Sequence, residues 1–134
     1  MRKLPLVKSV MTPFPYSVDI NTLLGDAHAY MHEHNIHHLP VTEGNKLVGI
    51  LDEHEVAGNR DIRANEINLK KPYIFDLNAR LDEVLSLMAD RRVYTVLITR
   101  KQKLVGIFTV TDACRRFAEY LRDEYGPFGG DEVA

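Results

Sequence analysis

Five of the six histidines lie close together, between positions 28 and 38 of the 134 residues. Imidazole is a common transition-metal ligand and changes its charge near neutral pH. His28 and His32 are four residues apart, which places both on one helical face and would suit zinc. Neither the H-E-x-x-H order nor a nearby cysteine accompanies them. We therefore predict no metal site. For His28, His32 and His34 we expect ordinary surface positions, with a pH-sensitive helical interface as a further hypothesis.

A second group of interest is Thr109 with Asp112, at the start of a predicted helix. A threonine followed three residues later by an acidic residue can form a capping box with the backbone N–H groups. Such a cap contributes about 1 kcal/mol without any ligand. The same helix start has unpaired N–H groups and the positive end of the helix dipole, and both suit a phosphate. A cap and a ligand contact both stay open for this pair.

The elements that position these residues come in two copies of one unit. The stretch NKLVGIL at Asn45–Leu51 returns 57 positions later as QKLVGIF at Gln102–Phe108. At the same offset Pro15-Tyr16 matches Pro72-Tyr73, and no gap is needed from Pro15 to Gly58. The chain is therefore an internal duplication.

Each copy reads as an extended segment, an amphipathic helix, two strands joined by a polar turn, and a second helix. The elements expected in the first copy are Tyr16–Ile20, Leu23–Glu33, Ile36–Thr42, Leu47–Leu51 and a weak helix after Asp52. Those of the second copy are Tyr73–Leu77, Leu81–Arg91, Val93–Thr99, Leu104–Phe108 and a helix from Asp112 to about Tyr125. The predicted fold class is α/β (α+β), with two β-α-β-β-α repeats packed sheet to sheet as one pseudo-symmetric module. We expect residues 1–60 to form the first repeat with an N-terminal arm, 61–125 the second with its linker, and 126–134 a disordered tail.

Several motifs in this order resemble a CBS domain. They are VMTP at Val10–Pro13, HHLPV at His37–Val41 and KLVGIL, and then VYTVLI, KLVGIF and TVTD in the second copy. A tandem pair over almost the whole chain is similar to the small stand-alone CBS-pair proteins of bacteria. The resemblance implies a regulatory module that binds an adenosine-containing ligand of the AMP, ADP or ATP class in the cleft between repeats. It also implies a homodimer formed through helices.

The resemblance further implies which residues line the ligand site. Asp112 would accept hydrogen bonds from both ribose hydroxyls, Thr109 would reach a phosphate, and Gly106 would allow close backbone approach. The remaining expected nucleotide-binding residues are Thr12, Asn68, Lys70, Tyr73, Tyr94, Thr95, and His37 and His38, which align with Tyr94 and Thr95. We assign Asn68, Lys70, Tyr73, Tyr94 and Thr95 to one site, in the second repeat, with packing as the alternative role of Tyr94 and a solvated position as that of Lys70. His37 and His38 take the equivalent phosphate-facing positions in the first copy.

The first repeat departs from this pattern, because Asp52 and Glu55 stand where the second has Thr109 and Asp112. A carboxylate in place of the hydroxyl would repel phosphate, so we interpret the pair as a helix cap. This site would then be empty, take a less anionic ligand, or use a bridging cation.

Composition limits the remaining function classes. Seventeen basic and 19 acidic residues give a net charge of −2, which does not favour nucleic acid or an anionic membrane. The single cysteine, Cys114, excludes an internal disulfide, and a cytoplasmic location is expected. The sequence has no nucleophile with a paired base, so it does not predict enzymatic activity, and we expect no required cofactor. The leading prediction is a ligand sensor that signals to an unknown effector protein through its conformation or oligomer contacts. The alternative is a scaffold for self-association or partner binding with its cleft unused, and a third, weaker reading is a histidine-dependent metal or pH sensor.

Overall fold

The computed structural model describes residues 3–126, and the element bounds follow the predicted duplication closely. The first repeat contains β2 (Val18–Asp19), α1 (Leu24–His34), β3 (His38–Glu43), β4 (Lys46–Asp52) and α2 (Glu53–Gly58). The second contains β5 (Ile74–Asp76), α3 (Leu81–Arg91), β6 (Thr95–Arg100), β7 (Lys103–Thr109) and α4 (Val110–Tyr125). Before and between them lie η1 (Val7–Ser9), β1 (Thr12–Pro13) and η2 (Ala64–Glu66). The α/β class and the two β-α-β-β-α repeats are confirmed, and most of the expected tail lies outside the described residues.

The local signals that separate these elements are visible in the hydrogen bonds. Asp19 and Asp76 each accept a hydrogen bond at 2.9 Å from the backbone N–H two residues later, a turn that ends the first strand of each repeat. Helix α1 ends where Asn35 adopts a left-handed conformation with φ 53°, and α3 ends in the same way at Arg92 with φ 54°. The two copies therefore stop their first helices with the same geometry.

The strands form one seven-stranded sheet in which the two repeats meet at β4 and β7. The order along the sheet is β2-β3-β4-β7-β6-β5, with β1 added to β7. The two central strands pair at Lys46 and Lys103, where each strand begins. The opposite ends of β4 and β7, at Asp52 and Thr109, carry the start of α2 and of α4. The candidate site lies at those ends.

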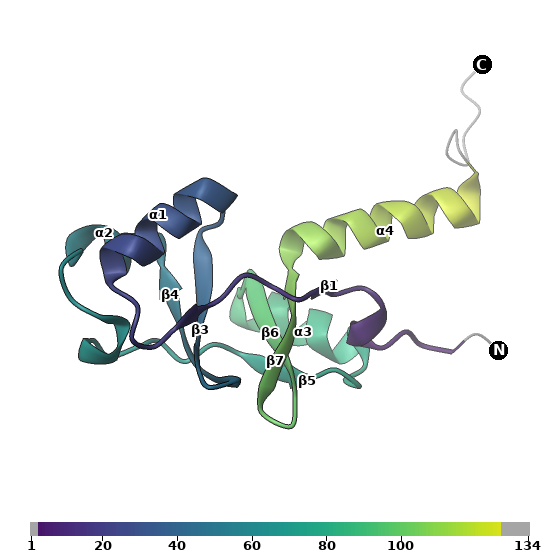
Figure 1. Ribbon diagram of the computed structural model, residues 1–134. Helices are drawn as coiled ribbons and strands as arrows, with labels where there is room; N and C mark the ends of the chain where they lie inside the picture. Colours follow the sequence, from purple (N-terminus) through teal and green to yellow (C-terminus); the bar gives the residue numbers. More distant parts are fainter. Residues whose placement is uncertain (1–2, 127–134) are drawn as a thin grey trace, which may run out of the picture.

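The N-terminal arm packs on the second repeat rather than the first. Val7 is fully buried in the hydrophobic cluster that contains Val84 and Phe108. Strand β1 pairs antiparallel with β7, and the crossing of the two is visible in Figure 1. The linker makes the reverse crossing, because Ala64 is buried in the cluster of the first repeat and Lys70 bridges to Ile50. Each repeat thus has its own core. The linker completes the core of the first repeat, and the N-terminal arm completes that of the second.

The two second helices differ in their packing. In α2 the side chain of Val56 is fully buried, and α2 lies beside α1. Helix α4 has no buried residue and projects away from the sheet (Figure 1). Over the part of the chain that the structure describes, no helix combines the length and apolar character needed to cross a bilayer.

Candidate functional site

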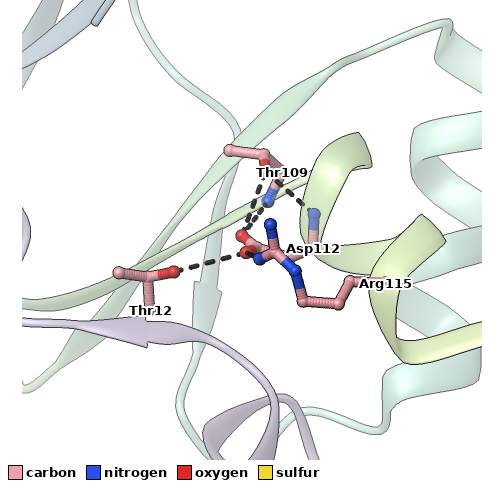
Figure 2. A network of polar contacts seen from close by, with 4 residues as sticks. All are labelled: Thr12, Thr109, Asp112 and Arg115. Atoms are coloured by element: carbon pink, nitrogen blue, oxygen red, sulfur yellow. Dashed lines mark hydrogen bonds and ion pairs between the residues drawn. The ribbon is translucent and has the colours of Figure 1, made fainter. Parts of the chain in front are cut away.

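Asp112 is the centre of a polar network at the start of α4 (Figure 2). Its Oδ2 accepts hydrogen bonds from the backbone N–H of Thr109 at 2.9 Å and from the Thr109 hydroxyl at 3.0 Å. In return the Thr109 Oγ1 accepts the Asp112 backbone N–H at 3.2 Å. The predicted capping box is therefore confirmed, and it fixes the orientation of the carboxylate.

The second oxygen of Asp112 faces the N-terminal arm. The Thr12 hydroxyl donates to Oδ1 at 3.3 Å, and Nη1 of Arg115 lies 3.8 Å from the same atom. The Asp112 side chain is 13% exposed, and Oδ1 is the oxygen that takes no part in the capping box. Arg115 was not predicted at this site, although its position one turn after Asp112 on a helix is a usable signal. Thr12 and Asp112 are 100 residues apart, and the structure brings them together as the resemblance implies.

Gly106 has a different role from the one expected. A Cβ added there would meet the Met11 side chain, with Cγ at 3.0 Å, rather than open space for a ligand. Gly49 stands at the equivalent place in the first repeat, and a Cβ there would lie 2.6 Å from Cβ of Leu69. Both glycines therefore admit the segment that crosses their strand. The expectation that Gly106 admits a ligand is wrong, because the arm occupies that space.

The start of α2 repeats this arrangement with two carboxylates. Glu55 accepts the Asp52 backbone N–H at 3.1 Å, and Asp52 Oδ1 accepts the Glu55 N–H at 2.9 Å, so the predicted cap is confirmed. The second oxygen of Asp52 pairs with the Lys70 ammonium. This contact holds the pKa of Asp52 below its ordinary value and raises the pKa of Lys70. The extra carboxylate of the first repeat is thus neutralised by its own linker.

Three hollows surround these two helix starts. The arm hollow, about 420 Å³, is lined by β1 and the segment before it together with Asp112, Arg115, Arg116 and Glu119. The central hollow, about 500 Å³, lies between Asn35–His38 of one repeat and Tyr94, Thr95, Ile107 and Thr109–Thr111 of the other. The linker hollow, about 210 Å³, is lined by Ile50, Asp52, Lys70–Tyr73 and Val93 with His38, Tyr94 and Thr95. The first two volumes fall in the range of ordinary small-ligand sites.

The predicted site residues do not all lie in one hollow. Thr109, Tyr94, Thr95, His37 and His38 line the central hollow, and Thr12 and Asp112 line the arm hollow beside it. Tyr94 is 69% exposed, so the alternative of a buried packing role does not hold.

The linker residues, in contrast, lie with the first repeat. Lys70 and Tyr73 do not line the hollow of Asp112, because both line the linker hollow, where Lys70 contacts Asp52. The physical reason is the crossing of the linker over β4, which alignment of the two copies does not reveal. Asn68 is exposed and does not line any of the three hollows.

The histidines have separate surroundings. His37 Nδ1 contacts Glu53 Oε2 at 2.9 Å, and this contact lowers the pKa of Glu53. The His34 ring stacks on Tyr16 with centroids 4.0 Å apart. His28 Nδ1 lies 3.3 Å from Nη1 of Arg60. Within residues 3–126, no group of three or more metal-binding side chains is arranged to hold an ion.

Comparison with known sequences places the chain in a family. Residues 7–60 and 64–119 each match the CBS domain, so the chain belongs to the CBS domain family as a tandem pair. Hypoxic response protein 1 of Mycobacterium tuberculosis is 31% identical over 100 residues, which cover 68% of this chain and 70% of that protein. The order of motifs and the observed fold agree with this assignment.

Solved structures agree with the fold. An acetoin utilization protein (AcuB) of Vibrio cholerae superposes with a TM-score of 0.81 at 23% identity, over 90% of this chain and 95% of that one. The CBS domain pair of protein MJ0100 superposes with a TM-score of 0.75 at 26% identity, over 88% and 99% of the chains. That structure is a complex with 5′-methylthioadenosine and S-adenosyl-L-methionine.

Proposed function

We propose that this protein is a regulatory CBS-pair module whose ligand is an adenosine-containing compound. The observation that carries the proposal is the Asp112 carboxylate, which Thr109 orients at the start of α4 and which lines the arm hollow, while Thr109 lines the central hollow. A carboxylate can accept hydrogen bonds from two vicinal hydroxyls, the group that distinguishes a ribose, when the ligand replaces the Thr12 contact at Oδ1. The adenosine ligands in the MJ0100 pair support this class of compound.

The neighbouring groups suit the rest of such a ligand. Thr109 and the first N–H groups of α4 lie at the positive end of a 16-residue helix dipole, beside the central hollow. His38 and Thr95 line the same hollow and can donate hydrogen bonds to a phosphate. In this proposal the ribose lies at Asp112 and the phosphate points into the central hollow.

Binding at Asp112 provides a route to a signal. A ribose hydroxyl at Oδ1 would compete with Thr12 of the arm and with Arg115 of α4. A ligand that binds one arrangement of these contacts more tightly than another shifts the population of both segments. The output of the module is therefore a change in β1 and α4, without a catalytic step.

The test is thermal unfolding of the purified protein with AMP, ADP, ATP, S-adenosylmethionine and NAD, alongside a panel of divalent metals. A compound present at about 100 times its dissociation constant adds roughly 2.7 kcal/mol of apparent stability. We expect this shift for at least one adenosine compound, and its loss in Asp112→Ala. Asp90→Asn, on the exposed side of α3, is the matched control that keeps the shift. Absence of a shift with every adenosine compound, in protein freed of bound ligand, would contradict the proposal.

We further propose that α4 carries the contact between two copies of this chain. Phe117, Tyr120, Leu121 and Tyr125 are 61%, 48%, 39% and 59% exposed, although they are large and apolar. The first half of α4 carries Arg115 and Arg116, and its second half is rich in acidic residues. Antiparallel packing of two such helices would place the basic half of each against the acidic half of the other. A second copy is thus the occupant that fits this face.

Sedimentation equilibrium tests this contact. We expect wild-type protein to be dimeric and Phe117→Glu to be monomeric, because a charge in the apolar stripe would be desolvated in the dimer. Arg122→Glu is the control, since residue 122 lies roughly 140° around the helix from residue 117. A monomeric wild type, or equal dissociation by both variants, would contradict the dimer. A dimer that persists while no adenosine compound binds would favour a scaffold function instead.

A further inference from the structure

The linker hollow and the central hollow adjoin each other. Both are lined by His38 at the start of β3 and by Tyr94 and Thr95 at the start of β6. These three residues form the boundary between the two hollows, and none of them is buried. A ligand in the central hollow can therefore extend past His38 and Thr95 into the linker hollow.

Charge is distributed unevenly along this path. The central hollow has hydroxyl and imidazole groups but no lysine or arginine among its lining residues. The linker hollow contains Lys70 and Lys71, both exposed, and one carboxylate, that of Asp52. Because Asp52 pairs with Lys70, the lining keeps one net positive charge from Lys71, before any contribution from His38. An anion is attracted to the far end of the path, away from Asp112.

The two lysines distinguish this hollow from its pseudo-symmetric counterpart. At the 57-residue offset, Lys70 and Lys71 align with Pro13 and Phe14, which carry no charge. The arm hollow instead mixes Asp112 and Glu119 with Arg115 and Arg116, so its lining has no net charge. The path from one end to the other is therefore polarised, with the carboxylate suited to ribose at one end and the lysines at the other.

We propose that the linker hollow holds the distal phosphates of a nucleotide whose nucleoside lies at Asp112, so that Lys71, assisted by Lys70, selects for di- and triphosphates over the monophosphate. This inference rests on the proposed function, since it needs the nucleoside at Asp112. The linker hollow, which is lined by Asp52 of the first repeat, would then bind phosphate without a second nucleoside. A phosphate group at Lys70 would share that ammonium with Asp52, so Lys71 supplies the main gain in affinity.

Calorimetric titration of AMP, ADP and ATP, free of divalent metal, tests the inference. We expect ATP to bind more tightly than AMP to the wild type. In Lys71→Gln the affinity for ATP should fall about tenfold, the effect of losing one charge-assisted contact of about 1.4 kcal/mol, while AMP affinity is unchanged. Lys101→Gln, in the turn between β6 and β7, is the control and should leave both affinities unchanged.

The outcomes separate this inference from the function beneath it. Equal affinities of the wild type for AMP and ATP, or an equal loss of both in Lys71→Gln, would overturn the phosphate-length selection. If AMP binding is lost in Asp112→Ala while Lys71→Gln changes nothing, only this inference fails. If none of the three nucleotides binds, the proposed function fails for nucleotides, and the inference fails with it.

Discussion

Gly49→Ala tests the crossing of the linker over β4, on which the linker hollow depends. The added Cβ would lie 2.6 Å from Leu69 Cβ, 3.0 Å from Leu69 Cδ1 and 3.2 Å from the Lys70 carbonyl oxygen. The first and last of these atoms belong to the linker backbone or are bonded directly to it. A rotamer change cannot relieve the clashes with these two atoms, so the linker backbone itself must move.

The expected cost follows from three contributions. Overpacking of this kind costs about 1–3 kcal/mol. Displacement of the linker would also weaken the hydrogen bond from the Ile50 N–H to the Lys70 oxygen, now 3.1 Å, worth about 1 kcal/mol. Alanine also reduces the conformational entropy of the unfolded chain, which stabilises the folded state by about 0.4–1 kcal/mol and offsets part of this cost. The net destabilisation should be about 2 kcal/mol.

Gly106→Ala is the matched variant in the second repeat. There the added Cβ comes closest to Sδ of Met11 and also meets its Cγ at 3.0 Å and its Cε at 3.1 Å, all atoms of one flexible side chain. A methionine has three rotatable side-chain bonds and can turn away, so the cost should stay below about 1 kcal/mol. Urea denaturation measures both variants, with a lower midpoint and an unchanged slope for Gly49→Ala. Equal destabilisation by the two substitutions, or a larger effect of Gly106→Ala, would refute this account of the crossings.

Two further predictions concern the arm and the Asp52–Lys70 pair. Val7→Ala removes two buried carbons from the second-repeat core and should destabilise by about 2 kcal/mol. Hydrogen exchange should show the loss of protection in α3, β6 and β7, and an equal loss in β3 and β4 would contradict the assignment of the arm to the second repeat. Because Lys70 lowers the pKa of Asp52, the pair contributes stability above the ordinary aspartate pKa, and the contribution is lost as the pH falls through the lowered folded-state pKa. Lys70→Met should therefore lower the stability slightly at neutral pH, since the exposed lysine is screened by solvent, and the difference from wild type should vanish in acid. A difference that persists below the folded-state pKa of Asp52 would show that the ion pair is not its cause.

The repeat offset predicted most of the fold because each element depends on local signals. Apolar periodicity gave α3 as Leu81–Arg91, the bounds observed, and α1 within one residue at each end. Both capping boxes followed from the spacing of Thr109 and Asp112 and of Asp52 and Glu55. These are interactions between neighbours in sequence, so a single chain is enough to predict them.

The composition of the site could be predicted only in part, because it depends on contacts between distant segments. Alignment of the two copies places Lys70 in register with Pro13, but it does not show which strand each segment crosses. Gly49 and Gly106 were available signals, since a glycine inside a strand often marks close approach of another backbone. Interpreted as crossing points, they would have placed Leu69 and Lys70 against β4 and Met11 against β7. The projection of α4 had no local signal of this kind, because its apolar stripe equally fits packing within the repeat.

The most direct test of the central claim is calorimetric titration of AMP and S-adenosylmethionine into wild-type protein and Asp112→Asn. Asparagine can still accept the Thr109 backbone N–H through its amide oxygen but cannot accept two ribose hydroxyls with a charged carboxylate, so the fold is retained while the proposed contact is weakened. Binding of at least one compound to the wild type, reduced about tenfold or more in Asp112→Asn, is the predicted result. Equal affinity of the two proteins, or no binding to either, would contradict an adenosine site at Asp112.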